Sequence, residues 1–161
     1  MKFKREERIN IVYEEQKKNL LPLTEREFLI AGLFLYLGEG AKQSPAQILV
    51  SNTDPDIVKF TLLWYTKILK IPRNKIRVGL QLYKDMNLKK ELNFWNKFLD
   101  IPLTNFWKPY IKKSITRSID HSGYKHGTCT LYYGNVPIKE KIMMGIKCIL
   151  DNINNKNFKG V

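Results

Sequence analysis

Cysteine, long apolar runs and acidic side chains are scarce in this chain of 161 residues. The two cysteines, Cys129 and Cys148, form no CxxC pair, which argues against a disulfide framework and predicts two buried thiols in a reducing compartment. A disulfide between them is the alternative. No stretch approaches the ~20 consecutive apolar residues of a membrane span, and the first residues, MKFKREER, contain no apolar signal region. We therefore expect an intracellular, cytoplasmic protein of bacterial, phage or organellar type that does not enter a membrane.

Motifs of several common enzyme classes are also missing. The chain has no nucleophile elbow, no glycine-rich phosphate loop and no dinucleotide-binding fingerprint. Nothing in the sequence therefore points to a serine hydrolase, a P-loop nucleotide hydrolase or a dinucleotide-dependent enzyme.

Positive charge is in large excess. The chain has 28 lysines and arginines against 15 aspartates and glutamates, which gives a formal net charge of +13. Such a surplus favours polyanionic partners, and nucleic acid is the leading candidate. The alternatives are a basic protein without such a partner and an anionic membrane surface, for which only the N-terminal segment is faintly amphipathic.

The length and the patterning favour a single α+β domain. Residues 1–19 alternate in charge and predict a solvated helix or arm, residues 20–155 carry the domain, and residues 156–161 form a tail. Capping signals and apolar periodicity predict the elements of the domain. Helices are expected at 24–38, 55–70, 87–99 and 137–152, and strands at 47–51, 75–83, 108–113 and 128–133.

The segment KIRVGLQLY, residues 75–83, alternates between apolar and polar side chains. The alternation predicts a strand with one face in the core and the other in water. The polar residues of this segment are of the types that contact phosphates, sugars and base edges of DNA. The alternative is an ordinary sheet face exposed to water. With two residues of the first strand, the expected DNA-facing set is Lys75, Arg77, Gln81, Tyr83, Gln47 and Ser51.

The densest basic cluster follows, interleaved with aromatic residues, and is suited to anchoring phosphates. It consists of Lys108, Lys112, Lys113 and Arg117. Three residues of zinc-binding type lie close by, His121, His126 and Cys129. Because only three candidates exist and Cys129 is expected in the core of a strand, zinc is the minor interpretation.

Residues 28–38 carry no charge and are mostly apolar, and the run ends in Glu39 between two glycines. A helix without a polar face is expected to be covered on more than one side. A carboxylate at a helix C-terminus faces the negative end of the helix dipole, at a cost of about 0.3–1 kcal/mol, unless a cation offsets it. The alternative is a solvated glutamate after a glycine-capped core helix.

The segment GLFLYLGEG resembles the signature helix of the LAGLIDADG homing endonucleases, in which an acidic residue stands between a small residue and a glycine. Its register assigns the acid to Glu39, where aspartate is commoner. Leu33 and Phe34 stand where the strict motif has a small pair, which Ala31 and Gly32 supply two residues earlier. A subgroup of poorly characterised bacterial and phage proteins, in which this domain follows a helix-turn-helix module, has similar finer features: GEGAK, SNTDP, KIRVGLQLY, KPYIK and GTCTLYY.

The resemblance implies an αββαββα fold, here with an extra helix at 87–99, that forms a saddle on double-stranded DNA. A chain with one motif would act as a homodimer, its two signature helices crossing through Ala31, Leu35 and Gly38. Paired Glu39 carboxylates would then bind Mg²⁺, and Lys42 is one candidate for an assisting lysine.

The implied function is a site-specific, Mg²⁺-dependent endonuclease of double-stranded DNA. Two alternatives remain on the same fold, a non-catalytic DNA-binding regulator and an RNA-binding intron maturase. A purely structural interaction domain is the least specific interpretation.

Overall fold

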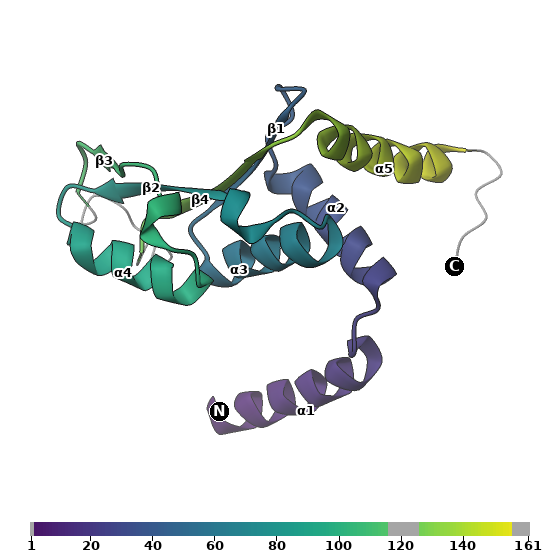
Figure 1. Cartoon of the computed structure of the whole chain (residues 1–161). Helices are drawn as coiled ribbons and strands as arrows, with labels where there is room; N and C mark the ends of the chain where they lie inside the picture. Colours follow the sequence, from purple (N-terminus) through teal and green to yellow (C-terminus); the bar gives the residue numbers. More distant parts are fainter. Residues whose placement is uncertain (1, 116–125, 156–161) are drawn as a thin grey trace.

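The computed structural model describes residues 2–115 and 126–155, which form an α+β fold with helices packed on a four-stranded sheet (Figure 1). The helices are α1 (Lys2–Leu20), α2 (Glu25–Glu39), α3 (Pro55–Leu63), α4 (Leu88–Leu99) and α5 (Val136–Asn154). The strands are β1 (Gln47–Asn52), β2 (Arg77–Tyr83), β3 (Tyr110–Lys112) and β4 (Thr128–Gly134). Shorter helical turns are η1 (Trp64–Ile68), η2 (Arg73–Lys75) and η3 (Leu103–Asn105). The predicted α+β class is confirmed.

Side-chain caps begin the helices of the domain. Thr24 and Glu27 form a reciprocal capping box at α2, the Thr24 hydroxyl accepting from the Glu27 amide at 3.2 Å. Asp54, Asn87 and Asn135 each accept a backbone N–H in the first turn of α3, α4 and α5. Because these signals are local, the sequence predicts the start of each of these helices to within about two residues.

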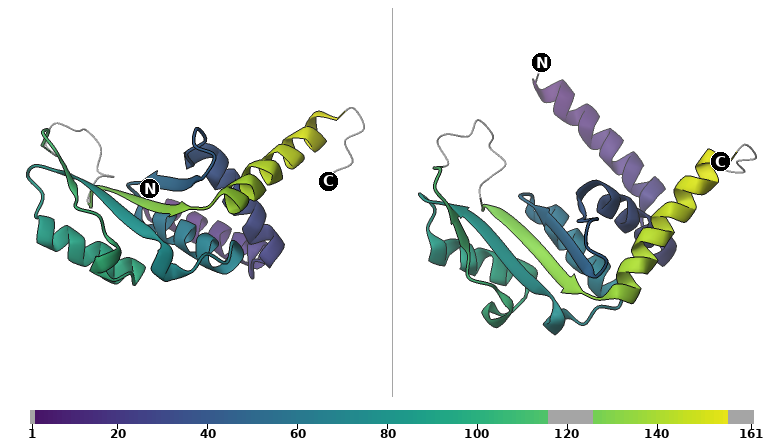
Figure 2. Two further views of the ribbon diagram at one scale, coloured as in Figure 1. Left: turned by 45° about the horizontal axis from the view of Figure 1, so that its top comes forward. Right: turned by 90° about the horizontal axis from the view of Figure 1, so that it is seen from above.

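The strands lie in the order β1-β4-β2-β3. The β1–β4 and β4–β2 pairs are antiparallel, and β2–β3 is parallel. Helices α3 and α4 lie against one face of this sheet (Figure 1), whereas the view from above looks onto a face that no helix covers (Figure 2). A mixed sheet with one packed face and one bare face needs apolar residues on one side only.

The hydrophobic core lies between the sheet and its helices. Alternate side chains of β2, from Val78 to Leu82, are buried together with their neighbours on β1 and β4. The helical side supplies large side chains, above all Leu62, Trp95 and Leu99. The covered face of the sheet consists of Ile48, Val50, Val78, Leu80, Leu82, Cys129 and Leu131.

The order of elements departs from the αββαββα pattern. One strand, β1, lies between α2 and α3 where that pattern has two, and three strands follow α3. At the free edge of β1, the Ala41 amide donates to the Leu49 carbonyl at 2.9 Å, and Gly40 bridges to Val50. The extra helix expected at 87–99 is present as α4. The element order therefore confirms the α+β class and leaves the specific family fold a prediction.

Three details of the sequence prediction are wrong. Lys75 ends the short turn η2 and is not part of a strand, because β2 begins at Arg77. Tyr83 is buried although it shares the parity of the solvated residues of β2. Of the two expected buried thiols, Cys129 is buried but Cys148 is exposed on α5, and both are free.

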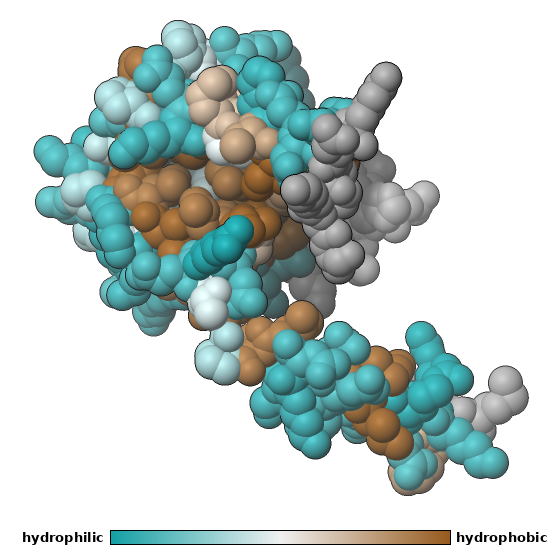
Figure 3. Space-filling view, turned by 90° about the vertical axis from the view of Figure 1, so that its right-hand side faces the viewer, coloured by the Kyte–Doolittle hydropathy of each residue, from teal (hydrophilic) through white to brown (hydrophobic). Residues whose placement is uncertain are grey.

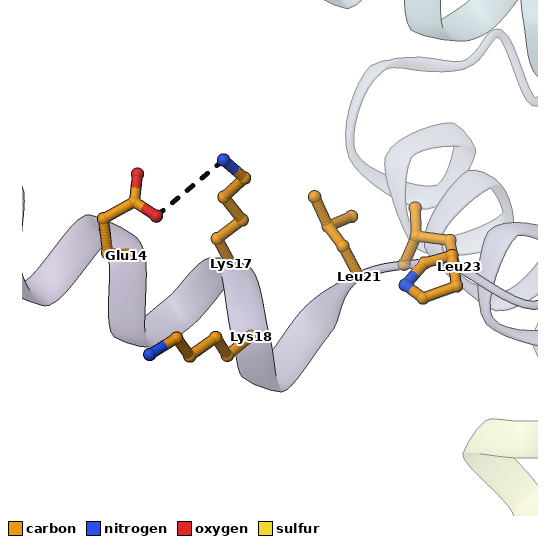
Figure 4. A pocket seen from close by; sticks show the side chains of 6 residues that line it. Glu14, Lys17, Lys18, Leu21 and Leu23 are labelled. Atoms are coloured by element: carbon orange, nitrogen blue, oxygen red, sulfur yellow. Dashed lines mark ion pairs between the residues drawn. The ribbon is translucent and has the colours of Figure 1, made fainter.

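Helix α1 stands clear of the rest of the molecule, and its residues from Phe3 onward are exposed (Figure 1). Its last turn leads through Leu21, Pro22 and Leu23 to α2, as the close view of this linker shows (Figure 4). Glu14 and Lys17 pair across one turn at 3.8 Å, an exposed contact that contributes little to stability. The predicted solvated helix is confirmed, while the predicted tail lies outside the described residues.

Within residues 2–115 and 126–155, no helix combines the length and the apolar character needed to cross a bilayer.

Candidate nucleic-acid interface

The bare face of the sheet, here called the open face, carries the alternate side chains of all four strands. The registers place Leu49, Tyr132 and Arg77 in one row, and Ser51, Thr130 and Gly79 in the next. A third row contains Thr128, Gln81 and Tyr110. Polar, aromatic and cationic side chains therefore gather on one surface, and they come from segments far apart in the sequence.

Four of the predicted DNA-facing residues lie on this open face. Gln47, Arg77 and Gln81 are exposed, and Ser51 is half-buried. The Arg77 guanidinium donates to the Thr104 carbonyl at 3.1 Å, which orients it at the start of β2. The Ser51 and Thr130 hydroxyls lie 2.7 Å apart across the β1–β4 pair. Thr130 and Tyr132 were not predicted here, although the alternation in TCTLYY contains that signal.

The basic cluster is only partly gathered at the open face. Lys108 and Lys113 are exposed, whereas the Lys112 ammonium lies 4.8 Å from the centre of the buried Tyr83 ring. Lys112 thus contacts the Tyr83 ring by a cation–π interaction, and this tyrosine is not a solvated side chain. Arg117 lies outside the described residues.

The zinc alternative receives no geometric support from the residues that can be placed. The His126 imidazole contacts the Glu91 carboxylate at 2.8 Å and stacks on Phe94, 3.5 Å between ring centres. Cys129 points into the core, where burial raises the pKa of its thiol. His121 lies outside the described residues.

Glu39 ends α2 and is exposed. The next residue, Gly40, bonds back to the Tyr36 carbonyl at 2.8 Å and bridges to β1, so the carboxylate stands where α2 meets the edge of the sheet. The Lys42 ammonium donates to the Gly40 carbonyl at 3.2 Å. Among the placed residues, no group of three or more His, Cys, Asp or Glu side chains could hold a metal ion. Glu39 is the one carboxylate in the last turn of α2.

A buried lysine beside this end of α2 was missed by the sequence interpretation. Lys139 of α5 donates to the Tyr36 hydroxyl at 2.7 Å and to the Ala41 carbonyl. Burial lowers the pKa of Lys139, and the positive charge of Lys42 lowers it further. The sequence did contain a signal that Lys139 is buried, because Lys139 shares a helical face with the buried Ile142 and Ile146. The network ties α5 to the backbone that follows Glu39.

Helix α2 has one packed side and one open side. On the packed side, Gly32 lets the Trp64 ring approach the helix backbone so closely that an added Cβ would lie 2.0 Å from the ring. On the open side, Ala31 and Gly38 are exposed, and Leu35 lines a shallow hollow beside α3. Because α2 contacts η1, α5 and β1, the expectation that it is covered on more than one side is met in part, and the rest of its apolar surface stays open within one chain. The exposed apolar side chains of α2 are Leu29, Ile30 and Phe34.

An apolar hollow of about 510 Å³ lies between α2, η1 and α5, lined by Leu29, Leu33 and Ile142 among others. Figure 3 shows apolar side chains gathered in a hollow on this side of the molecule, ringed by hydrophilic ones. This hollow lies on the opposite side of α2 from Ala31, Leu35 and Gly38, the three predicted interface residues, so the helix has two separate apolar surfaces.

Comparison with protein-family models, with curated proteins and with solved structures finds no match to this chain. The LAGLIDADG resemblance and every role derived from it therefore depend on the sequence motif alone.

Proposed function

We propose that this chain is a homodimeric protein that binds double-stranded DNA through the open face of its sheet and hydrolyses it with Mg²⁺ at Glu39. The observation that carries the proposal is the open face itself. It places Arg77, Gln81 and Ser51, which are phosphate-binding and base-reading types, on one bare surface of a chain with a net charge of +13.

The homodimer is supported by the uncovered side of α2. Contiguous exposed apolar side chains are costly in a monomer and typical of interfaces. Ala31 and Gly38 allow a second helix to approach closely there, since an added Cβ at Gly38 would meet nothing within 4 Å. A two-fold pairing of α2 would place two Glu39 carboxylates together.

A pair of Glu39 carboxylates is a donor set that fits Mg²⁺. Mg²⁺ is commonly held by one or two carboxylates together with substrate phosphates and water. Glu39 of each chain would supply the carboxylates, and DNA bound on the open face would supply the phosphate. The ion would contribute a Lewis acid and an activated water for phosphodiester hydrolysis.

The test is to incubate the full chain with plasmids that carry its own flanking DNA, with Mg²⁺ or with EDTA. We expect a discrete Mg²⁺-dependent linear product that Glu39→Gln abolishes while duplex affinity stays equal or rises. Glu140→Gln removes an exposed carboxylate from α5 and should leave cleavage unchanged, which makes it the matched control. Cleavage that persists in Glu39→Gln would contradict the assigned role.

A non-catalytic DNA-binding regulator is the second candidate, favoured by the single carboxylate that each chain offers at the end of α2. Tight, salt-sensitive duplex binding without any cut in Mg²⁺ would select it. Competition with structured intron RNA would separate both candidates from an RNA-binding maturase, because the RNA would then displace the duplex.

A further inference from the structure

The open face presents three aromatic side chains whose role the proposed function leaves open. Trp107, which precedes β3, lies 5.2 Å from Tyr132 between ring centres, and Tyr110 lies across from Gln81. We call Trp107, Tyr110 and Tyr132 the aromatic platform. These rings lie among the polar residues of the face and away from the core on its other side.

Trp107 differs from the other two tryptophans of the chain. Trp64 and Trp95 are 1% and 0% exposed, whereas Trp107 is 44% exposed and Tyr110 is 63% exposed. An exposed indole leaves a large apolar area in water, so its presence on a sheet face calls for an explanation other than core packing.

The fold holds Trp107 in place. Its amide donates to the Val78 carbonyl at 2.9 Å, and the preceding residue, Phe106, bridges to Val78. Gly79 lies directly beneath, and a Cβ added there would be 3.4 Å from the indole. The ring therefore lies against bare strand backbone, positioned before any ligand arrives.

The surroundings of the platform match a nucleotide. Arg77 is in the row of Tyr132 and offers a cation for a phosphate beside the rings, and the exposed Lys108 follows Trp107 in the chain. Gln81 and Thr128 lie in the row of Tyr110 and offer hydrogen-bonding groups for base edges. Aromatic rings beside cations in this manner bind single-stranded nucleic acid by stacking.

We propose that the aromatic platform stacks unpaired bases, so that the preferred nucleic acid contains a single-stranded element such as a bulge, a loop or an opened step. In a perfect duplex the base faces are stacked on one another and are not accessible to a ring on a protein surface. This inference rests on the proposed function, because it assumes that the open face binds nucleic acid, and it names the feature that the face selects.

The test measures the affinity of the full chain for four probes: oligothymidylate, oligouridylate, a fully paired duplex and the same duplex with a central bulge. Trp107→Ala should weaken binding to the single strands and the bulged duplex about tenfold and leave the paired duplex nearly unchanged. Trp107→Phe should recover most of the loss, since it keeps a ring. Comparing the two oligonucleotides shows whether the face distinguishes DNA from RNA.

Two further readouts keep the outcome interpretable. Thermal unfolding should be similar in the wild type and in Trp107→Phe, and the fluorescence quenching produced by oligothymidylate should disappear in Trp107→Phe because the other two tryptophans are buried. An equal loss of affinity for all four probes in Trp107→Ala, or no loss for any, would overturn the proposal.

The arginine variant separates this inference from the proposed function. Arg77→Ala should weaken all four probes and reduce the salt dependence of binding by about one phosphate contact. If Arg77→Ala weakens the duplex and Trp107→Ala has no effect on any probe, only the stacking inference fails. If wild-type binding is weak and insensitive to salt for every probe, the proposed function fails as well.

Discussion

The two faces of the sheet are made by neighbouring residues and yet face opposite environments. On β2, Val78, Leu80 and Leu82 are no more than 2% exposed, whereas Arg77 and Gln81, which belong to the alternate set, are exposed. The pleat of a strand alone produces this separation, because successive side chains point to opposite faces. Core packing and the proposed binding surface therefore use alternate residues, which can be changed separately.

Helix α2 repeats the contrast with a different period. Gly32 and Tyr36 face the core one turn apart, while Ala31 and Gly38 face outward. The uncovered side of α2 is apolar, however, and the open face of the sheet is polar and aromatic. The difference favours a protein partner on the helix and a nucleic-acid partner on the sheet.

The largest effect is expected from changing the covered face of β2. Leu80→Ala should lower the free energy of unfolding by about 2–5 kcal/mol, because it leaves a cavity among buried side chains. The matched change one residue along, Gln81→Ala, should stay within about 0.5 kcal/mol of the wild type. Urea unfolding measures the free energy of unfolding of both variants. Similar losses of stability in the two variants would show that the open face is packed.

A smaller effect is expected from two identical changes on opposite sides of α2. Gly32→Ala should cost about 1–3 kcal/mol, since its methyl group would overlap the Trp64 ring. Gly38→Ala should be neutral or should stabilise by up to about 1 kcal/mol, because the space is open and alanine favours the helix. The measurement is chemical unfolding at low protein concentration, where association does not contribute. A loss in Gly38→Ala equal to that in Gly32→Ala would contradict the open side.

Replacing tyrosine by phenylalanine is expected to change the free energy of unfolding in opposite directions at two buried positions. The Tyr65 hydroxyl is buried and has no hydrogen-bond partner among the residues the structure describes, so Tyr65→Phe should stabilise the protein by about 1 kcal/mol. The Tyr36 hydroxyl donates to the Ala41 carbonyl at 2.6 Å and accepts from Lys139, so Tyr36→Phe should destabilise by about 1–3 kcal/mol. Thermal or urea unfolding of the two variants measures these changes. A loss of stability in Tyr65→Phe would indicate that the Tyr65 hydroxyl has a hydrogen-bond partner in solution.

The smallest effect is chemical and leaves the fold unchanged. In native protein at mildly alkaline pH, a thiol reagent should modify one cysteine, Cys148, quickly. Cys129 should react only after denaturation, because it is buried in the covered face and burial raises the pKa of its thiol. Cys148→Ser should remove the fast phase. Rapid modification of both cysteines in the native protein would show that β4 opens readily.

The sequence by itself determined what depends on near neighbours along the chain. Helices begin close to the residues where the sequence predicts them, after the caps Thr24, Asp54, Asn87 and Asn135. The alternation along β2 assigns Val78, Leu80 and Leu82 to the core correctly and fails only at Tyr83. These features follow from helix and strand periodicity and from hydrogen bonds over three or four residues. The polar members of the candidate site on β1 and β2 could be read from the same alternation.

Only the tertiary structure decided which distant segments meet. The order β1-β4-β2-β3, the parallel pairing of β2 with the short β3 and the burial of Tyr83 near Lys112 leave no local pattern. The same holds for Trp107 over Gly79. The periodicity of α5 indicates that Lys139 is buried, but not that it contacts the backbone at the end of α2. Such contacts depend on closing long loops and on filling the space between elements, and the free energies of those steps belong to the whole fold and to no short stretch of sequence.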